Sequence, residues 1–598
     1  MGLFANLFTY SNRASDPLDN DHGPDRHNHQ LVVIDWVKVE VPVMLCVMII
    51  LVVLTKIGYS SLKKSIENVT WLRWIRNFPE SCVILIVGLL LGLVVREVEI
   101  FESGPEIEEK EEKNNFTLYS ESEEFFQTKS TFANILLTPE VFFIYILPPI
   151  IFDAGFDMPR DKFKENLRDI LIYAIVGTLL NAFMIGFGLY GIEEWIGFGS
   201  SENLSLIVLL LFGAIISAVD PVAVIAVFDD IHVNIDLFIL VLGESLLNDG
   251  VAVVLYHVFD DFVKLPQAPD SIDIGLAFAS FAIIVIGGIA IGLVMGFLAS
   301  FVTRFSYKVK SLEVLLILTI PYLSYWLADM LEFSSILSVV TCAFIMRSYV
   351  DRNLDHSTCE AIEIFTKNLA TIMEMIIFIL LGIVAVVLDW KNHFNWQLTL
   401  WTLFFCTVAR PLVTVFLTWC INHWKMKRIP WKDQFIMSFS GLRGGIAFGL
   451  ITLSSIDEAS DADSKEMFII TTIVIIYFTN FIQGSLVGPI INFFQIEKEV
   501  KHEVVMVGQR VNEMMINSVV DGVDAICGAA AFNSMTTVHK FDTWWRKTFD
   551  PILIRDYQKK NDKFDLMYSD WKQAAGRDLF RMQSESSSVV DLTFTSVK

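Results

Sequence analysis

The chain has 598 residues, of which 54% are hydrophobic and 19% are charged. A soluble chain is typically about 45–50% apolar and about 25% charged, so this composition excludes a disordered protein and argues against a soluble enzyme. The formal net charge of −23 argues against a nucleic-acid partner.

Long apolar runs hold the excess of hydrophobic residues. A helix that crosses a bilayer needs about 20 apolar residues. We predict thirteen such helices, at 39–58, 81–96, 140–156, 168–192, 205–228, 236–259, 273–302, 309–328, 333–350, 362–388, 397–422, 432–454 and 466–492. The predicted domains are an extracellular segment (1–38), a transmembrane domain (39–492) and a cytoplasmic tail (493–598). The predicted fold is an all-α polytopic membrane protein with a helical tail.

The loops predict the orientation of these helices. Most loop lysines and arginines follow odd-numbered helices, and basic loops stay in the cytoplasm. The N-terminus is therefore predicted outside and the tail inside. The acidic loop 97–139 then lies outside, where its sequon at Asn115 is a predicted glycosylation site.

Ionisable residues lie inside the predicted spans, where each costs about 2.5–3.5 kcal/mol. They are Asp153, Asp220, Glu244, Asp249, Glu374, Arg410 and Arg443. These groups have to pair, become neutral or line a wet cavity, or else serve only as polar contacts between packed helices. Acids outnumber bases among them, and this excess predicts a pathway for cations. Arg443 balances either Asp153 or Asp220, whereas Glu374 has no assigned partner.

Two predicted spans carry helix breakers at their centres. In span 205–228, Pro221 follows Asp220, and proline removes a backbone donor and clashes with the preceding turn. In span 432–454, three glycines loosen the turn, namely Gly441, Gly444 and Gly445. Each break taken singly is compatible with a simple kink. These are the fifth and twelfth predicted helices, and two helices an odd number apart cross the membrane in opposite directions. We therefore predict that an inverted repeat relates them, with a binding site at the membrane midplane.

Span 236–259 carries its carboxylates near the middle. Asn248 and Asp249 are adjacent, and Glu244 lies five residues before Asp249. The two acids therefore project about 140° apart on a helix. They cannot share one ligand position, and we expect them to have different roles.

On these residues the chain resembles the sodium/proton exchangers of the animal plasma-membrane type, in the cation/proton antiporter superfamily (monovalent cation:proton antiporter 1 family). The resembling stretches keep their order and include 147–155, 216–228, 243–259, 409–410 and 433–444. The resemblance implies that Asp249 carries the ion and the proton, with Asn248 beside it. It implies that Glu244 pairs with Arg410 and that Asp220 lies where the broken helices cross. It also implies a homodimer.

Burial disfavours an ionised carboxylate, so one proton or one Na⁺ can neutralise Asp249, but not both. We therefore expect a secondary active transporter rather than an enzyme, with no cofactor. It would exchange external Na⁺ for internal H⁺ one for one, without net charge, and so regulate intracellular pH, sodium and volume. Na⁺ would bind at Asp249, with carbonyls of the broken helices completing an oxygen shell. A K⁺/H⁺ or broad monovalent cation exchanger is an alternative, as is a cation channel.

The tail carries two amphipathic patterns. One apolar stripe repeats every four residues and consists of Val511, Met515, Val519, Val523 and Cys527. Residues 505–530 resemble the family's binding segment for a calcineurin-B-homologous EF-hand protein, and the alternative is a helix that folds back on the tail. An aromatic cluster follows, at Phe541, Trp544, Trp545 and Phe549. With its basic neighbours, this cluster predicts either contact with anionic lipid or a core within the tail.

Overall fold

The structure is a computed structural model of the chain. It describes residues 46–59, 61, 80–103, 142–198, 204–220, 224, 228, 233–265, 270–306, 310–388, 390–425, 428–456, 462–494, 544–545 and 548–555. The chain divides into two units, Met1–Val47 and Met48–Lys598, and the packing described below lies within the second. The predicted glycosylation site at Asn115, the proline at Pro221 and the apolar stripe of the tail lie outside the described residues.

The described part of the chain is helical, and its only bridge between extended residues is isolated. The named elements in chain order are α2 (Glu80–Ser103), η4 (Phe142–Ile146), α7 (Leu147–Phe156), α8 (Arg160–Leu171), η5 (Ile172–Gly177), α9 (Thr178–Trp195), α10 (Leu206–Ser217), α12 (Ile235–Val263), α13 (Ser271–Phe305), α14 (Lys310–Met330), α15 (Ser335–Asn353), α16 (His356–Val387), α17 (Trp390–His393), α18 (Trp396–Trp424), α19 (Trp431–Phe439), α20 (Gly445–Leu453), α22 (Ala462–Phe478), η7 (Thr479–Gly484) and α23 (Ser485–Phe494). Elements labelled η are π-helices. A further apolar helix covers Cys46–Tyr59.

Seven helices among the described residues are long and apolar enough to cross a membrane. They are Lys162–Trp195, Ile235–Val263, Ile272–Phe305, Glu313–Met330, Ser357–Val387, Trp396–Trp424 and Ser464–Phe494. The prediction of an all-helical membrane protein is therefore confirmed in outline. Each predicted span overlaps a helix of the structure. The number of crossings and the inverted repeat stay predictions.

The fourth predicted span begins earlier than the apolar pattern indicated. We expected it at 168–192, but α8, η5 and α9 form one helical stretch that begins at Arg160. The first part is amphipathic, because Phe163 and Asn166 are buried whereas Lys164 and Glu165 between them are exposed. An amphipathic turn lowers the average hydropathy without ending the helix, so an apolar-run criterion misses it.

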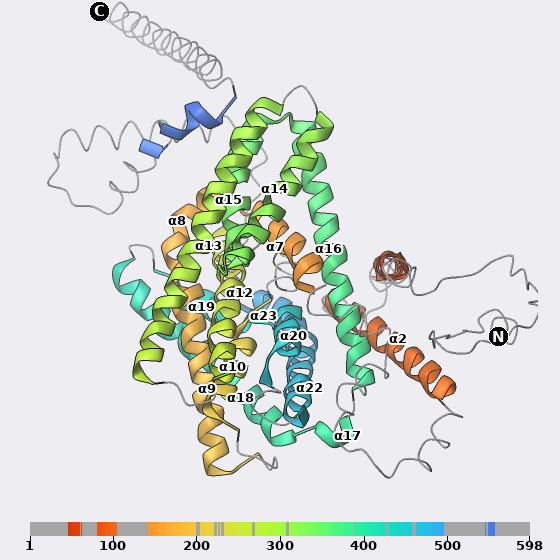
Figure 1. Cartoon of the computed structure of the whole chain (residues 1–598). Helices are drawn as coiled ribbons and strands as arrows, with labels where there is room; N and C mark the ends of the chain where they lie inside the picture. The colour runs from red at the N-terminus through yellow and green to blue at the C-terminus, as the bar shows by residue number, and fades with distance from the viewer. Residues whose placement is uncertain are drawn as a thin grey trace, which may run out of the picture. The chain divides into compact units, whose positions relative to one another are not determined.

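Both predicted interruptions occur, and they lie against each other. Helix α10 ends at Ser217, and the second broken span divides into α19 and α20. At these two breaks the chain forms an isolated bridge, in which the backbone N–H of Asp220 donates to the carbonyl of Leu442 at 2.8 Å. Helices α10, α12 and α20 pack on one another around this bridge (Figure 1). The centre of the membrane domain therefore holds irregular backbone that is covered by protein, as the bilayer requires.

Small residues set the closest helix contacts. Gly288, Gly292 and Gly296 repeat every four residues on α13 and face α15. On α2, a methyl group added to Gly88 would lie 2.6 Å from the carbonyl oxygen of Ile379 on α16. Such small-residue stripes let membrane helices approach closely. Because of these glycines, α13 packs tightly on α15, and α2 packs tightly on α16.

The described tail residues contact the ends of α13 and α15. The Asn353 side chain donates to the carbonyl of Leu553 and accepts from the N–H of Arg555, both at 2.9 Å. Trp545 and Phe549 pack on the ring of Phe297 from α13, with centroids 5.5 and 5.2 Å away. The second half of the predicted aromatic cluster therefore packs on membrane helices, a position that neither sequence alternative foresaw.

Candidate ion-binding site

The end of α10 presents carbonyl groups to the centre of the fold. The last carbonyls of any α-helix lack partners within the helix. Here Arg443 Nη1 donates to the carbonyl oxygens of Ser217 at 2.8 Å and Ala218 at 3.0 Å. Its positive charge also suits the negative end of the helix dipole. Arg443 is thus hydrogen-bonded to main-chain oxygens, and the balance of its charge by Asp153 or Asp220 stays a prediction.

One face of α12 is hydrogen-bonded to the same break. The hydroxyl of Ser245 donates to the carbonyl of Val219. One turn later, Asn248 Nδ2 donates to the carbonyl of Ser217 at 3.2 Å. The other end of this amide, Asn248 Oδ1, accepts from the hydroxyl of Thr178 on α9 at 2.8 Å. The amide of Asn248 is thus held at both ends, which fixes α12 against α10 and α9.

Asp249 occupies the next position on α12 and is only 6% exposed. The backbone of Val219 and the carboxylate of Asp220 both interact with its carboxylate. Its Oδ1 atom is buried, and it has no hydrogen-bond partner among the described residues. A buried carboxylate with an unused oxygen is costly unless a proton or a cation neutralises it. Asp249 is therefore the candidate binding group.

Glu244 and Arg410 lie apart from this carboxylate and contact each other. Arg410 Nη2 is 3.0 Å from Glu244 Oε1, and the two side chains are 5% and 7% exposed respectively. Arg410 comes from α18, and Gly441 leaves room for it, because an added methyl group would overlap the guanidinium. The two acids of α12 therefore have different surroundings, in line with their angular separation.

The glycines of the second broken span provide room rather than a special backbone conformation. An added methyl group at Gly444 would overlap the carboxylate of Asp220, and one at Gly445 would overlap Ile377. Gly444 has an ordinary extended backbone, with φ −121° and ψ −169°. Their sequence pattern predicts that these glycines loosen the turn, and the helix does break there. The structure adds a second reason for glycine at these positions, because other groups approach the backbone closely.

The remaining predicted acids lie on neighbouring helices. Asp153 on α7 is next to Thr366 of α16. Glu374, near the middle of α16, interacts electrostatically with the acids Asp220, Glu80 and Asp153. Asp220 thus interacts both with Asp249 and with Glu374.

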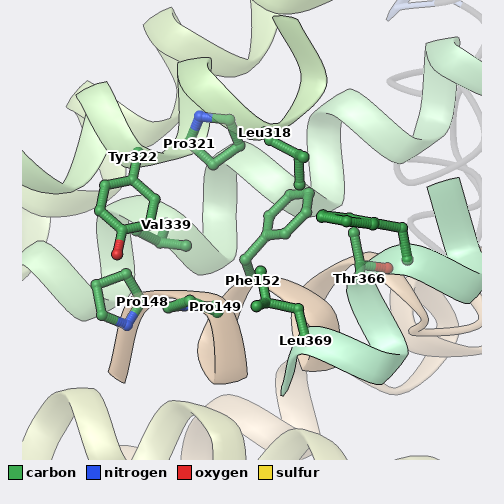
Figure 2. A pocket seen from close by; sticks show the side chains of 10 residues that line it. Pro148, Pro149, Phe152, Leu318, Pro321, Tyr322, Val339, Thr366 and Leu369 are labelled. Atoms are coloured by element: carbon green, nitrogen blue, oxygen red, sulfur yellow. The ribbon is translucent and has the colours of Figure 1, made fainter. Parts of the chain in front are cut away.

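A cavity of about 190 Å³ lies between α7, α14, α15 and α16. Figure 2 shows its lining, which is formed by Pro148, Pro149, Phe152, Leu318, Pro321, Tyr322, Val339, Phe365, Thr366 and Leu369. No carboxylate is among these residues, so the cavity does not suit a cation. Among the described residues, no group of three or more His, Cys, Asp or Glu side chains could hold a resident metal ion either.

The sequence analysis missed three polar residues that hold this centre together. Besides Thr178, they are Thr479 and Asn480 at the start of the π-helix η7. Thr479 Oγ1 accepts from the N–H of Arg443 at 3.2 Å, and Asn480 Nδ2 donates to the carbonyl of Arg443 at 3.0 Å. Isolated π-helical turns are frequent at functional sites, but the sequence alone carries no sign of them.

A family model described as "Sodium/hydrogen exchanger, transmembrane" matches residues 34–493. The chain belongs to this sodium/hydrogen exchanger family. It is 37% identical to sodium/hydrogen exchanger 2 of Oryctolagus cuniculus over 529 residues, which are 88% of this chain and 59% of the relative. It is 34% identical to human sodium/hydrogen exchanger 3 over 540 residues, which are 89% of this chain and 58% of the relative. This exchanger-family chain thus spans about three fifths of the length of these relatives.

The same fold occurs in a solved antiporter. The structure of the sodium proton antiporter MjNhaP1 from Methanocaldococcus jannaschii superposes with a TM-score of 0.52 at 18% identity, covering 75% of this chain and 98% of that one. At this identity the likeness concerns the fold alone. The family match confirms the resemblance that the sequence indicated. It places this exchanger-family chain among transport proteins rather than enzymes.

Proposed function

We propose that the chain is an electroneutral antiporter that exchanges one external Na⁺ for one internal H⁺. The observation that carries this proposal is the carboxylate of Asp249, which is buried beside two helix breaks and keeps one oxygen without a partner among the described residues. The oxygen can take a proton or coordinate a sodium ion. Because each neutralises the same charge, the two ions compete for Asp249 and cannot occupy it together.

The charged group that acts on Asp249 is Asp220, and the two buried arginines of this centre are engaged elsewhere. Arg443 is engaged with main-chain carbonyls, and Arg410 is engaged with Glu244. Asn248 is uncharged at any physiological pH and adds no second titrating group. With Asp249 loaded by either ion, the site has the same net charge. Transport in the two directions then moves one Na⁺ against one H⁺ without current.

Hard oxygen ligands for Na⁺ are available at the same place. Oxygen donors suit hard cations, and carbonyls of broken membrane helices serve this purpose in other transporters. The Oδ1 atom of Asp249 is one such oxygen. The carbonyl oxygen of Val219 accepts one hydrogen bond, from Ser245, and keeps a second lone pair. A tenfold inward Na⁺ gradient is worth about 1.4 kcal/mol, which is enough to sustain one unit of pH difference.

The cellular setting of this exchange is proposed from the sequence. Loop charges support an external N-terminus and a cytoplasmic tail, and the membrane we propose is the plasma membrane. There the exchanger would regulate intracellular pH, sodium and volume. It would act as a homodimer that is glycosylated at Asn115. An EF-hand protein would bind residues 505–530, and anionic lipid would contact the tail near its aromatic cluster.

The test compares Asp249→Asn with the wild-type chain in sealed liposomes that contain a pH-sensitive dye. An outward H⁺ gradient is imposed, and external Na⁺ is then added. We expect Na⁺-driven proton efflux from the wild type and none from Asp249→Asn. The control is Asp261→Asn, which makes the same change at an exposed position of the same helix and should transport normally. Full activity of Asp249→Asn would overturn the assignment of the carrier.

Stoichiometry and ion choice are tested in the same liposomes. The membrane potential is clamped with K⁺ and an ionophore and then stepped between values. An electroneutral exchanger gives a flux that does not depend on the potential, whereas a flux that follows the potential would exclude one-for-one exchange. In ionophore-free liposomes, replacing external Na⁺ by K⁺ tests the alternative substrate, and we expect little proton flux with K⁺.

A further inference from the structure

The hydroxyl of Thr178 lies between two acceptors. Its oxygen is 2.6 Å from the carbonyl oxygen of Ala174 in the preceding turn and 2.8 Å from Asn248 Oδ1 on α12. Thr178 is 2% exposed and Asn248 is 1% exposed, so water does not compete for these bonds. A hydroxyl has one hydrogen, which can serve either acceptor. Thr178 is the one described residue that donates to the amide oxygen of Asn248.

Local helix geometry places Thr178 at this position. The π-helix η5 covers Ile172–Gly177 and ends immediately before it. A π-helical turn holds more residues than an α-helical turn, so it rotates the residues that follow around the helix axis. In this chain the rotation directs Thr178 toward α12, and both η5 and α9 pack against α12.

The two bonds of Asn248 determine which way its amide faces. Asn248 Nδ2 donates to the carbonyl of Ser217, and its Oδ1 accepts from Thr178. If the amide were reversed, its oxygen would face the carbonyl oxygen of Ser217, and two acceptors would repel each other. The Ser217 carbonyl and the Thr178 hydroxyl together therefore favour the orientation that keeps α12 in register with the end of α10. Asp249 is the next residue of α12, so the same bond sets its position relative to Val219.

We propose that Thr178 is a positioning residue for sodium, which acts by holding the amide of Asn248. The inference rests on the proposed Na⁺/H⁺ exchange at Asp249. Sodium needs several oxygens at fixed distances, whereas a proton needs only the carboxylate. A loss of register between α12 and α10 therefore weakens sodium binding more than proton binding. Thr178 is thus a specificity-determining residue that acts through Asn248 without touching the ion.

The test is Thr178→Val, which keeps the shape of the side chain and removes the hydroxyl. One buried hydrogen bond corresponds to about a fivefold to tenfold change in an equilibrium constant. We expect the half-saturating Na⁺ concentration to rise by about this factor, while the internal pH of half-maximal activity is unchanged. Thr178→Ser, which restores the hydroxyl, should return the Na⁺ dependence to that of the wild type.

A matched control separates this role from general packing. Thr472 on α22 is fully buried, and its hydroxyl donates only to the carbonyl of Phe468 within its own helix. Thr472→Val should leave the Na⁺ dependence unchanged. An unchanged Na⁺ dependence in Thr178→Val, an equal change in its Na⁺ and H⁺ dependences, or no rescue by Thr178→Ser would each overturn the inference. Failure of the proposed function itself is distinguishable, because the wild type would then show no Na⁺-driven proton flux.

Discussion

Removing the guanidinium of Arg410 leaves the carboxylate of Glu244 buried without its counter-charge. The two groups are 3.0 Å apart, and both side chains are more than nine-tenths buried. In such a pair the cost of taking both charges out of water is already incurred in the folded state. Losing one partner therefore typically costs about 3–5 kcal/mol, because the remaining charge stays buried. We expect Arg410→Ala to lower the free energy of unfolding by this amount.

Two further variants test whether the loss comes from the unpaired charge. The double variant Glu244→Gln with Arg410→Met removes both charges, and replacing a whole buried pair is often nearly neutral. It should recover most of the stability that Arg410→Ala loses. The control is Glu165→Ala, which removes the partner of Lys162 in a pair whose side chains are 62% and 40% exposed. An exposed pair is worth about 0–1 kcal/mol, so this variant should resemble the wild type.

The assay is unfolding of the purified full-length chain in detergent micelles at increasing denaturant concentration, followed by tryptophan fluorescence. The midpoints and slopes give the unfolding free energies of the four proteins. Two results would refute the reasoning. Either Arg410→Ala unfolds at the wild-type midpoint, or the double variant is as unstable as the single one. The second result would mean that the shape of the Arg410 side chain, rather than its charge, stabilises the centre.

Two more predictions follow from contacts of the broken helices and of the tail. In Gly444→Ala the new methyl group overlaps the carboxylate of Asp220, and such overpacking costs about 1–3 kcal/mol, so Na⁺-driven proton flux should fall sharply. Gly191→Ala, which has open space around it, should transport normally, and equal fluxes in the two variants would contradict the argument. Asn353→Ala removes both hydrogen bonds to Leu553 and Arg555, so hydrogen–deuterium exchange in residues 548–555 should accelerate. Unchanged exchange would show that the remaining contacts, among them the Arg352–Asp550 ion pair and the packing of Phe549, hold this segment without Asn353.

Much of the membrane architecture follows from properties that lie along the chain. Apolar length alone locates helices such as α12, α13 and α16, because a bilayer requires about 20 consecutive apolar residues. Proline and glycine place the two interruptions, since both disturb the regular hydrogen-bond ladder. Buried charges such as Asp249 stand out because so few are tolerated at that depth. These features need no knowledge of which helices are neighbours.

The partners of the polar side chains were decided only by the packing of the helices. Most hydroxyls in apolar helices donate to their own preceding turn, as Thr402 does to Leu398 at 2.7 Å. Thr178 makes the same local bond and also reaches Asn248, so its sequence context does not distinguish it from Thr402. Likewise, Arg443 binds the carbonyls at the end of α10 only because the two breaks meet. Helix length and burial are local consequences of composition, whereas these contacts depend on how segments distant in sequence are positioned in space.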